Sequence, residues 1–257
     1  MDFSKKCNDL SSKEWLQNSF SIWRGLTKTK EEREYNHPAS YPMSLCIKIL
    51  RTFAKPHCRV IDPFNGIGST TTAASQLSCQ AVGIDLSIEY CRVAKNRVNN
   101  DHNIKIINGN SLEIVKTLQS DYFDLCLTSP PYWDILNMKR TADKKTNQNY
   151  SEHDQDLGNI PDYYIFLSSL SAIFLELKRT LRKNAYCIVN VMDIRKRNNF
   201  YPLHIDIVNA MREIGYIFDD LIIWDRQSDY NNMRPLGYPY KFRINKVHEY
   251  LLIFIKD

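Results

Sequence analysis

The sequence lacks any apolar run long enough to cross a membrane. Its most apolar stretch, LLIFI at 251–255, is far shorter than the roughly 20 residues that a spanning helix needs. The first ten residues, MDFSKKCNDL, contain no apolar core of the kind found in signal peptides. We therefore expect a cytoplasmic protein with no membrane partner.

Paired cysteine motifs and repeats are also missing. The seven cysteines form no C-x-x-C pair and are odd in number, which indicates neither a zinc cage nor a disulfide framework. We expect reduced, mostly buried thiols and no metal site. Without internal repeats or low-complexity tracts, the 257 residues are long enough for one large α/β domain.

Short β-rich runs alternate with helical patterns along the chain. The clearest helix is expected at 163–181, where apolar residues recur at steps of three and four. Such alternation predicts an α/β fold with a mostly parallel sheet and helices on both faces. The last two strands have no helix between them and should form an antiparallel hairpin. Seven strands are expected, at 59–63, 81–85, 104–109, 123–129, 187–192, 217–224 and 249–255.

A glycine-containing turn follows the first expected strand, in DPFNGIGSTTTAA at 62–74. Gly66 and Gly68 let the backbone turn tightly beside a ligand, although a G-x-G turn alone is a weak signal. Asp85 ends the second strand about twenty residues later, where a carboxylate can accept hydrogen bonds from ribose hydroxyls. Together these residues predict a site for an adenosine-containing ligand.

The dinucleotide fingerprint is incomplete, because Thr71 stands where its third glycine belongs. Asp62 precedes the turn, where it can meet a cationic amino-acid head group instead of a pyrophosphate. Asn110 and Ser111 follow the third strand and can border an adenine ring. An adenosyl amino acid is therefore favoured over a dinucleotide.

The hexapeptide TSPPYW at 128–133 directly follows the apolar run FDLCL. Two consecutive prolines remove two ladder N–H groups and fix φ twice. The strand therefore ends in a rigid ledge whose last carbonyls and side chains point into open space.

DPFNGIGST followed by TSPPYW resembles the amino-methyltransferase family of DNA methyltransferases, and HPASYP at 37–42 is similar to that family's proline-containing segment. The resemblance covers nearly the whole chain. It implies a Rossmann-like fold, S-adenosyl-L-methionine as cofactor and double-stranded DNA as partner. The cofactor-binding residues implied are Pro38, Pro42, Asp62, Phe64, Asn65, Gly66, Gly68, Ser69, Thr70, Asp85, Leu86, Asn110, Ser111 and Thr128.

The same resemblance implies the chemistry of the ledge. Ser129 Oγ and the Pro130 carbonyl would accept the two N–H groups of an exocyclic amine, with Pro131 fixing the geometry. Tyr132 would stack on a flipped-out base, and Trp133 would either extend that surface or be a buried aromatic. Serine in the first motif position is typical of cytosine-N4 members, so we expect that activity, with adenine-N6 methylation as the alternative.

No separate target-recognition domain is expected within 1–257. Base reading would fall to loops at 134–160 and 228–246 or to the N-terminal extension at 1–36. Basic clusters at 139–145 and 178–197 favour a polyanionic partner if they flank one site, although a solvated surface is the plain alternative. The substrate-binding candidates are Trp133, Lys139, Arg140, Arg234, Tyr240 and Arg243.

Three other classes share parts of this pattern. A glutamine- or RNA-amine methyltransferase would have the cofactor loop, but usually with Asn or Asp in place of Ser129. A non-enzymatic binding module would not need an intact ledge, and Pro63 and Thr71 disfavour a nicotinamide dehydrogenase. The sequence leaves open the recognition sequence, the oligomeric state and a cognate restriction endonuclease.

Overall fold

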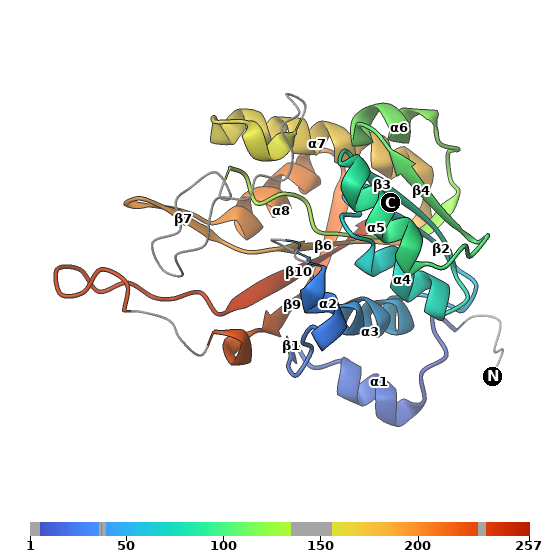
Figure 1. Cartoon of the computed structure of the whole chain (residues 1–257), viewed down its shortest axis with the longest axis horizontal. Helices are drawn as coiled ribbons and strands as arrows, with labels where there is room; N and C mark the ends of the chain where they lie inside the picture. The colour runs from blue at the N-terminus through green and yellow to red at the C-terminus, as the bar shows by residue number, and fades with distance from the viewer. Residues whose placement is uncertain (1–5, 36, 38–39, 135–155, 231–234) are drawn as a thin grey trace.

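The chain folds around an eight-stranded sheet and also forms a separate two-stranded hairpin (Figure 1). The computed structural model describes residues 6–35, 37, 40–134, 156–230 and 235–257. Within these residues the strand order is β1-β9-β10-β6-β5-β2-β3-β4. The strands are β1 (Ile22–Trp23), β2 (Arg59–Asp62), β3 (Gln80–Asp85), β4 (Ile104–Asn108), β5 (Phe123–Thr128), β6 (Leu181–Val191), β9 (Tyr216–Asp225) and β10 (His248–Lys256), and the hairpin is β7 (Ile194–Lys196) with β8 (Asn199–Tyr201).

All seven expected strands form. The β7–β8 hairpin was not expected, and neither was an eighth strand of the main sheet, β1. It adds to the edge of the sheet in parallel with β9, where Ile22 pairs with Ile223. Two residues are too few to show an alternating pattern. Five of the seven neighbouring pairs are parallel, and β10 pairs antiparallel with β9, which confirms the expected C-terminal hairpin.

The helices follow the expected alternation with the strands. The longest, α7, begins after Asp162, whose Oδ1 accepts from the backbone N–H groups of Tyr164 and Ile165 at 2.9 Å. No helix in the described part of the chain has both the length and the apolarity of a membrane span. The helices are α1 (Ser12–Asn18), α2 (Lys30–Glu34), α3 (Met43–Phe53), α4 (Ser69–Gln76), α5 (Ile88–Arg97), α6 (Ser111–Thr117), α7 (Tyr163–Thr180) and α8 (Leu203–Glu213), with 3-10 turns η3 (Leu157–Asn159) and η4 (Gln227–Asp229).

Helices cover both faces of the sheet because successive strand residues point to opposite sides. On β5, Leu125 and Leu127 pack in the core formed with α3 and α4, whereas Cys126 between them packs in the core formed with α6, α7 and α8. Figure 1 shows α7 and α3 on opposite sides of the sheet. All seven thiols are free and six are buried, as expected.

The carboxyl ends of β2, β3, β4, β5, β6 and β9 meet at one edge of the sheet, since these strands run in the same direction. The antiparallel β10 starts at that edge with His248. Ligands of open α/β sheets bind at this edge. Both sequence motifs and the described part of the segment between β9 and β10 therefore follow or precede strands at the same edge.

Candidate active site

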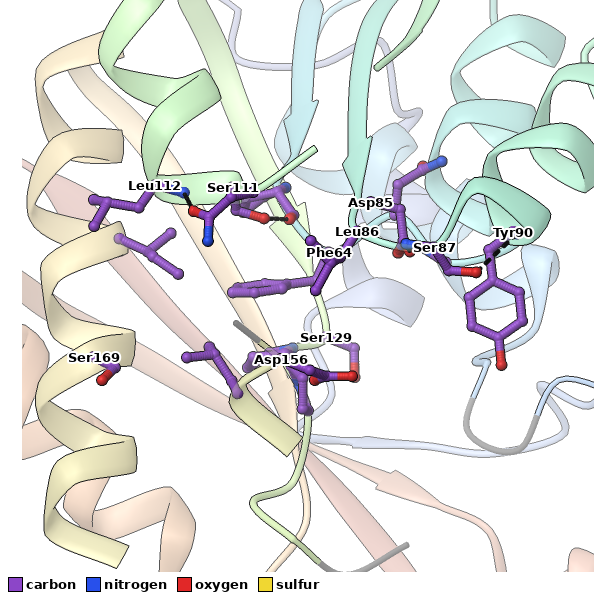
Figure 2. A pocket seen from close by; sticks show the side chains of 18 of the residues that line it. Phe64, Asp85, Leu86, Ser87, Tyr90, Ser111, Leu112, Ser129, Asp156 and Ser169 are labelled. Atoms are coloured by element: carbon purple, nitrogen blue, oxygen red, sulfur yellow. Dashed lines mark hydrogen bonds between the residues drawn. The ribbon is translucent and has the colours of Figure 1, made fainter. Parts of the chain in front are cut away.

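A cavity of about 630 Å³ lies at the carboxyl edge of the sheet. This volume is in the range of small-molecule and cofactor sites. Figure 2 shows Phe64, Asp85, Ser111 and Ser129 around it, from four different strand ends. The cofactor motif and the Ser-Pro-Pro motif therefore share one cavity. Of the predicted site residues, Phe64, Asn65, Gly66, Ser69, Asp85, Leu86, Asn110, Ser111, Ser129, Pro130 and Pro131 line it.

The turn after β2 depends on glycine at two places. Gly68 has φ +85°, and a Cβ there would come within 2.8 Å of the Ala94 Cβ. Gly83 on β3 lies against Asn65, because a Cβ at Gly83 would sit 2.4 Å from the Asn65 Cγ. The sequence motif indicated Gly68. Gly83 was missed because it lies outside any motif, although it makes room for Asn65 in the cavity wall.

Asp85 joins the turn to the end of β3. Its Oδ2 accepts from the Gly66 N–H at 2.7 Å, and its Oδ1 accepts from the Ser87 N–H at 2.8 Å. Burial raises the pKa of the carboxyl to about 6. Each oxygen keeps acceptor capacity for a further donor in the cavity.

Asp62 lies beneath the cavity and not in its wall. Its Oδ1 accepts from Thr128 Oγ1 at 2.6 Å and from the Phe64 N–H at 3.0 Å, and its Oδ2 accepts from the Tyr41 hydroxyl at 3.0 Å. Burial raises the pKa of this carboxyl. In this structure Asp62 ties β2 to β5, so the expected direct contact with a cationic head group is replaced by internal hydrogen bonds. Thr70, Thr128 and Gly68 do not line the cavity either. Thr70 Oγ1 donates to the Leu127 carbonyl at 3.4 Å.

The β4–α6 connection forms another wall. Asn110 caps α6, since its Oδ1 accepts from the Leu112 and Glu113 N–H groups at 2.9 and 3.3 Å. Ser111 donates its hydroxyl hydrogen to the Pro63 carbonyl. That hydrogen is therefore not available to a ligand, which can contact only the rest of the side chain. These bonds fix the loop that the sequence assigned to the adenine ring.

The HPASYP segment at 37–42 borders the same cavity through His37, Ser40 and Tyr41. Burial lowers the pKa of His37 to about 3, so its ring is neutral near pH 7. Pro38 lies outside the described residues. Pro42 does not line the cavity, because it starts α3, where its carbonyl accepts from the Leu45 N–H at 3.1 Å.

The Ser-Pro-Pro motif reaches the cavity, but the aromatic residues after it do not. Tyr132 is buried, and its hydroxyl donates to Glu249 at 2.8 Å. Trp133 is 3% exposed, and its Nε1 donates to the Ile160 carbonyl at 2.8 Å. In this structure neither ring is an open stacking surface, and Trp133 is buried, which is one of the two roles that the sequence left open.

The segment before β10 projects from the body of the protein, near the β7–β8 hairpin (Figure 1). Tyr240 and Phe242 are 95% and 93% exposed. Arg243 donates to the Arg197 carbonyl at 3.1 Å and to Asn198 Oδ1 at 2.7 Å, so it joins this segment to the hairpin connection. Lys139, Arg140 and Arg234 lie outside the described residues.

The basic cluster at 178–197 does not flank a single site, contrary to expectation. Its first part lies at the amino end of β6, where Arg179 donates to the Leu118 and Val115 carbonyls at the end of α6 and Lys178 donates to the Gly215 carbonyl. Only Arg195 to Arg197 follow β6 at the carboxyl edge. An eleven-residue strand of roughly 3.3 Å per residue separates the two parts.

Three residues behind the motif were missed in the sequence. Asn190 bonds to the Ser129 and Tyr132 hydroxyls, Glu249 accepts from Tyr132 and Asn190, and Arg226 forms an ion pair with Glu249. Of these three residues, only Glu249 stands out in the sequence, because it is a single carboxylate at the start of an apolar strand. Asn190 gave no signal, because one amide in a strand is common.

Comparison with known proteins finds a match to the family profile described as DNA methylase, over residues 2–96 and 123–257. A type II methyltransferase of Lactococcus lactis, M2.LlaDCHI, is 35% identical over 30% of this chain and 29% of its own length. M.BslI of a Bacillus species is 24% identical over 63% of this chain and 17% of its own, and M.HinfI of Haemophilus influenzae is 34% identical over 37% and 27%. The chain spans less than a third of the length of each of these relatives.

Two solved structures have so little sequence identity to this chain that their similarity shows the fold alone. TrmN from Thermus thermophilus has a TM-score of 0.52 and 13% identity, over 85% of this chain and 50% of that one. A precorrin 8w decarboxylase from Methanobacterium thermoautotrophicum has a TM-score of 0.51 and 12% identity, over 84% and 92%. Both support the Rossmann-like arrangement. Because the family profile matches most of the chain and includes both motifs at the cavity, this chain belongs to the N6/N4 family of DNA methylases.

Proposed function

We propose that the chain transfers a methyl group from S-adenosyl-L-methionine to the exocyclic N4 amine of cytosine in double-stranded DNA. The observation that carries this proposal is the position of Ser129 and Pro130 in the wall of the cavity that also contains Asp85. A group that accepts from an amine and a group that accepts from a ribose thus face one enclosed space.

The residues of the cavity fit S-adenosyl-L-methionine, which is the cofactor of this family and supplies an electrophilic methyl group when bound. Asp85 has acceptor capacity for ribose hydroxyls, and Leu86 and Asn110 border the place proposed for adenine. Asn65 Nδ2 is a buried donor with no hydrogen-bond partner among the described residues. A polar ligand in the cavity would remove the cost of leaving that donor unpaired.

Ser129 and Pro130 are proposed to activate the amine. The lone pair of an exocyclic amine is delocalised into its ring, which makes the nitrogen a poor nucleophile. Acceptance of its two N–H groups by Ser129 Oγ and the Pro130 carbonyl favours a more tetrahedral nitrogen whose lone pair faces the methyl group. Pro130 and Pro131 fix these acceptors before the substrate arrives.

The choice of cytosine N4 rests on Ser129, because serine at this position resembles cytosine-N4 members of the family. Adenine N6 is the second candidate, since a hydroxyl and a carboxylate can each accept one N–H. Amines of RNA or of protein rank behind both bases of DNA. Double-stranded DNA is preferred because the family profile is described as DNA methylase and the relatives named above are called type II methyltransferases.

The DNA-facing surface is proposed to include 235–246 and the β7–β8 hairpin. These segments contain exposed aromatic residues together with Arg197, Lys241 and Lys246 and have no acidic residue between 235 and 246. Cations neutralise phosphates, and aromatic rings stack on unpaired bases. Tyr240 and Arg243 fit this role, and the roles of Lys139, Arg140 and Arg234 stay predictions.

Restriction-modification is the proposed biological setting, with a cognate endonuclease as partner in the cytoplasm. The type II names of the relatives support it, although one relative, M.BamHII, is called an orphan methyltransferase. A single catalytic domain within 1–257 stays part of the proposal. A screen for protection of DNA from restriction enzymes would identify the methylated sequence.

The deciding experiment incubates the purified chain with labelled S-adenosyl-L-methionine and duplex DNA or structured RNA. Methylated DNA is then digested to nucleosides, and the product is identified by mass and retention. We expect N4-methyldeoxycytidine. N6-methyldeoxyadenosine as the sole product would overturn the cytosine assignment, and methylation of RNA alone would overturn DNA as substrate.

A further inference from the structure

A buried carboxylate lies directly behind the Ser-Pro-Pro-Tyr motif. Glu249 on β10 is 4% exposed, and three donors from three other segments reach it. Its Oε2 accepts from the Tyr132 hydroxyl at 2.8 Å and from Asn190 Nδ2 at 2.5 Å. Its Oε1 accepts from the Arg226 guanidinium, which supplies the opposite charge.

This carboxylate sets the direction of the neighbouring hydrogen bonds. An ionised carboxylate only accepts, so Tyr132 gives its single hydroxyl hydrogen to Glu249. The Tyr132 oxygen is then an acceptor towards Asn190 Nδ2 at 3.0 Å and towards Ser129 Oγ at 3.2 Å. The orientation of the Asn190 amide follows too, because its oxygen would otherwise meet the carboxylate.

Ser129 completes the chain of bonds. Its hydrogen can go to the Tyr132 oxygen or to the main-chain carbonyl oxygen of Asn190, each 3.2 Å away. Either choice places the hydrogen inside the protein. The Ser129 oxygen therefore faces the cavity as an acceptor, which is the role that an amine substrate requires.

We propose that Glu249 is a positioning residue for methyl transfer, which holds the Tyr132 hydrogen away from Ser129 and so leaves the acceptor capacity of the Ser129 oxygen to the substrate amine. This inference rests on the proposed function and extends it to a residue on the last strand. Glu249 does not contact the cavity itself. Its effect is on the orientation of hydrogens, and so on the rate of transfer and not on cofactor binding.

Stability alone gives little reason for a charge at this place. A buried ion pair contributes no more to folding than well-packed apolar residues of similar volume, and often less. The middle of β10 follows that rule, since Leu251, Leu252, Ile253 and Phe254 are apolar and buried. The ion pair between Glu249 and Arg226 lies at the end of β10 that is next to the Ser-Pro-Pro-Tyr motif.

The test compares Glu249→Gln with Tyr132→Phe and with the double variant. Gln keeps the shape of the side chain but can donate to Tyr132, which would turn the tyrosine hydrogen towards Ser129. We expect single-turnover methylation of duplex DNA, at saturating cofactor, to slow by at least about tenfold. The Kd of S-adenosyl-L-methionine should stay within about twofold. Glu213→Gln, an exposed carboxylate at the end of α8, is the matched control and should match the unsubstituted chain.

A thermodynamic cycle separates positioning from a structural role. If Glu249 acts through the Tyr132 hydroxyl, Glu249→Gln should slow the Tyr132→Phe enzyme by less than about twofold. The same slowing factor in both backgrounds would overturn the inference. So would a Glu249→Gln enzyme with the rate of the unsubstituted chain.

Loss of folding by Glu249→Gln would not end the test. Glu249→Asp keeps the charge beside Arg226 but withdraws the acceptor from Tyr132 by one methylene. It should also slow transfer by about tenfold while binding cofactor normally, and an unchanged rate would overturn the inference. Absence of transfer by the unsubstituted chain to any nucleic acid would instead refute the proposed function, and this inference with it.

Discussion

The two halves of the cavity are built in different ways. On the cofactor half, the bonds are local or join residues of the strand-end motifs: Asp85 accepts from the N–H two residues later and from the Gly66 N–H, 19 residues earlier, and Asn110 caps the helix that follows it. On the catalytic half, Ser129 and Tyr132 are held by residues 58 to 117 positions away in the sequence. The first arrangement can be written as a short motif, whereas the second exists only in the folded protein.

The difference predicts that substitutions in the two halves will have separable effects. Changes on the cofactor half should act on binding of S-adenosyl-L-methionine. Changes on the catalytic half should act on the rate of transfer once the cofactor is bound.

Ser129→Ala should have the largest effect. Removal of the hydroxyl deletes one of two proposed acceptors for the amine, so we expect turnover to fall by roughly 10² or more. The Kd of S-adenosyl-L-methionine, measured by calorimetry, should not change. Ser19→Ala at the exposed end of α1 is the control. Weakened cofactor binding in a folded Ser129→Ala enzyme would erase the distinction between the halves.

Asp85→Ala should give the reverse pattern. The ribose hydroxyls would lose a charged acceptor, and binding of S-adenosyl-L-methionine should weaken by roughly 1–3 kcal/mol. At saturating cofactor the rate of transfer should stay close to that of the unsubstituted chain. Calorimetry that shows unchanged affinity in a folded Asp85→Ala protein would place the ribose elsewhere, and Asp219→Ala, an exposed carboxylate, controls for charge.

The fold was largely predictable for the same reason that the cofactor half was. The expected strands have apolar runs whose pattern is local, and their alternation with helices fixed the parallel order. The strand β1 escaped prediction because it is held by pairing with Ile223 and Trp224, some 200 residues away. A local pattern contains no information on such a partner.

The catalytic half shows the limit more clearly. The sequence identified Ser129 and Pro130, but it placed Tyr132 at an open surface and left that role open for Trp133. Both are enclosed because Glu249 and the Ile160 carbonyl satisfy their polar atoms. Charge clustering misled in a similar way, since Arg179 donates to a carbonyl at the end of α6 and does not line the cavity. Residues close in sequence can lie at opposite edges of the sheet when a long strand runs between them.

The DNA-facing segments should affect neither half directly. Arg197→Gln with Lys241→Gln removes two exposed cations from the projecting surface, so DNA affinity should fall by roughly tenfold at low salt. The slope of log K against log salt should become shallower by roughly 1–2. Lys183→Gln with Arg212→Gln, exposed cations away from the carboxyl edge, should leave the slope unchanged. Equal slopes for both pairs would exclude the projecting surface from DNA contact.

A pH titration should give the smallest effect and should act on the cofactor half alone. Burial raises the pKa of Asp85 to about 6, so the carboxyl becomes protonated below that pH. If the ribose hydroxyls need the ionised form, S-adenosyl-L-methionine binding should weaken by about fourfold between pH 7.5 and pH 5.5. His37 adds nothing in this range, because burial lowers its pKa to about 3.

The sign of the shift also makes a prediction for stability. A carboxyl whose pKa is higher in the folded chain holds a proton that the unfolded chain releases, from about pH 4 upwards. The contribution of Asp85 to the free energy of unfolding should therefore decrease as pH rises from about 4 to 6 and then level off. Asp85→Asn should remove this decrease and the pH dependence of cofactor binding together. If Asp85→Asn removed the pH dependence of stability but kept that of cofactor binding, or the reverse, the group that titrates in the cavity would not be the group that binds the ribose.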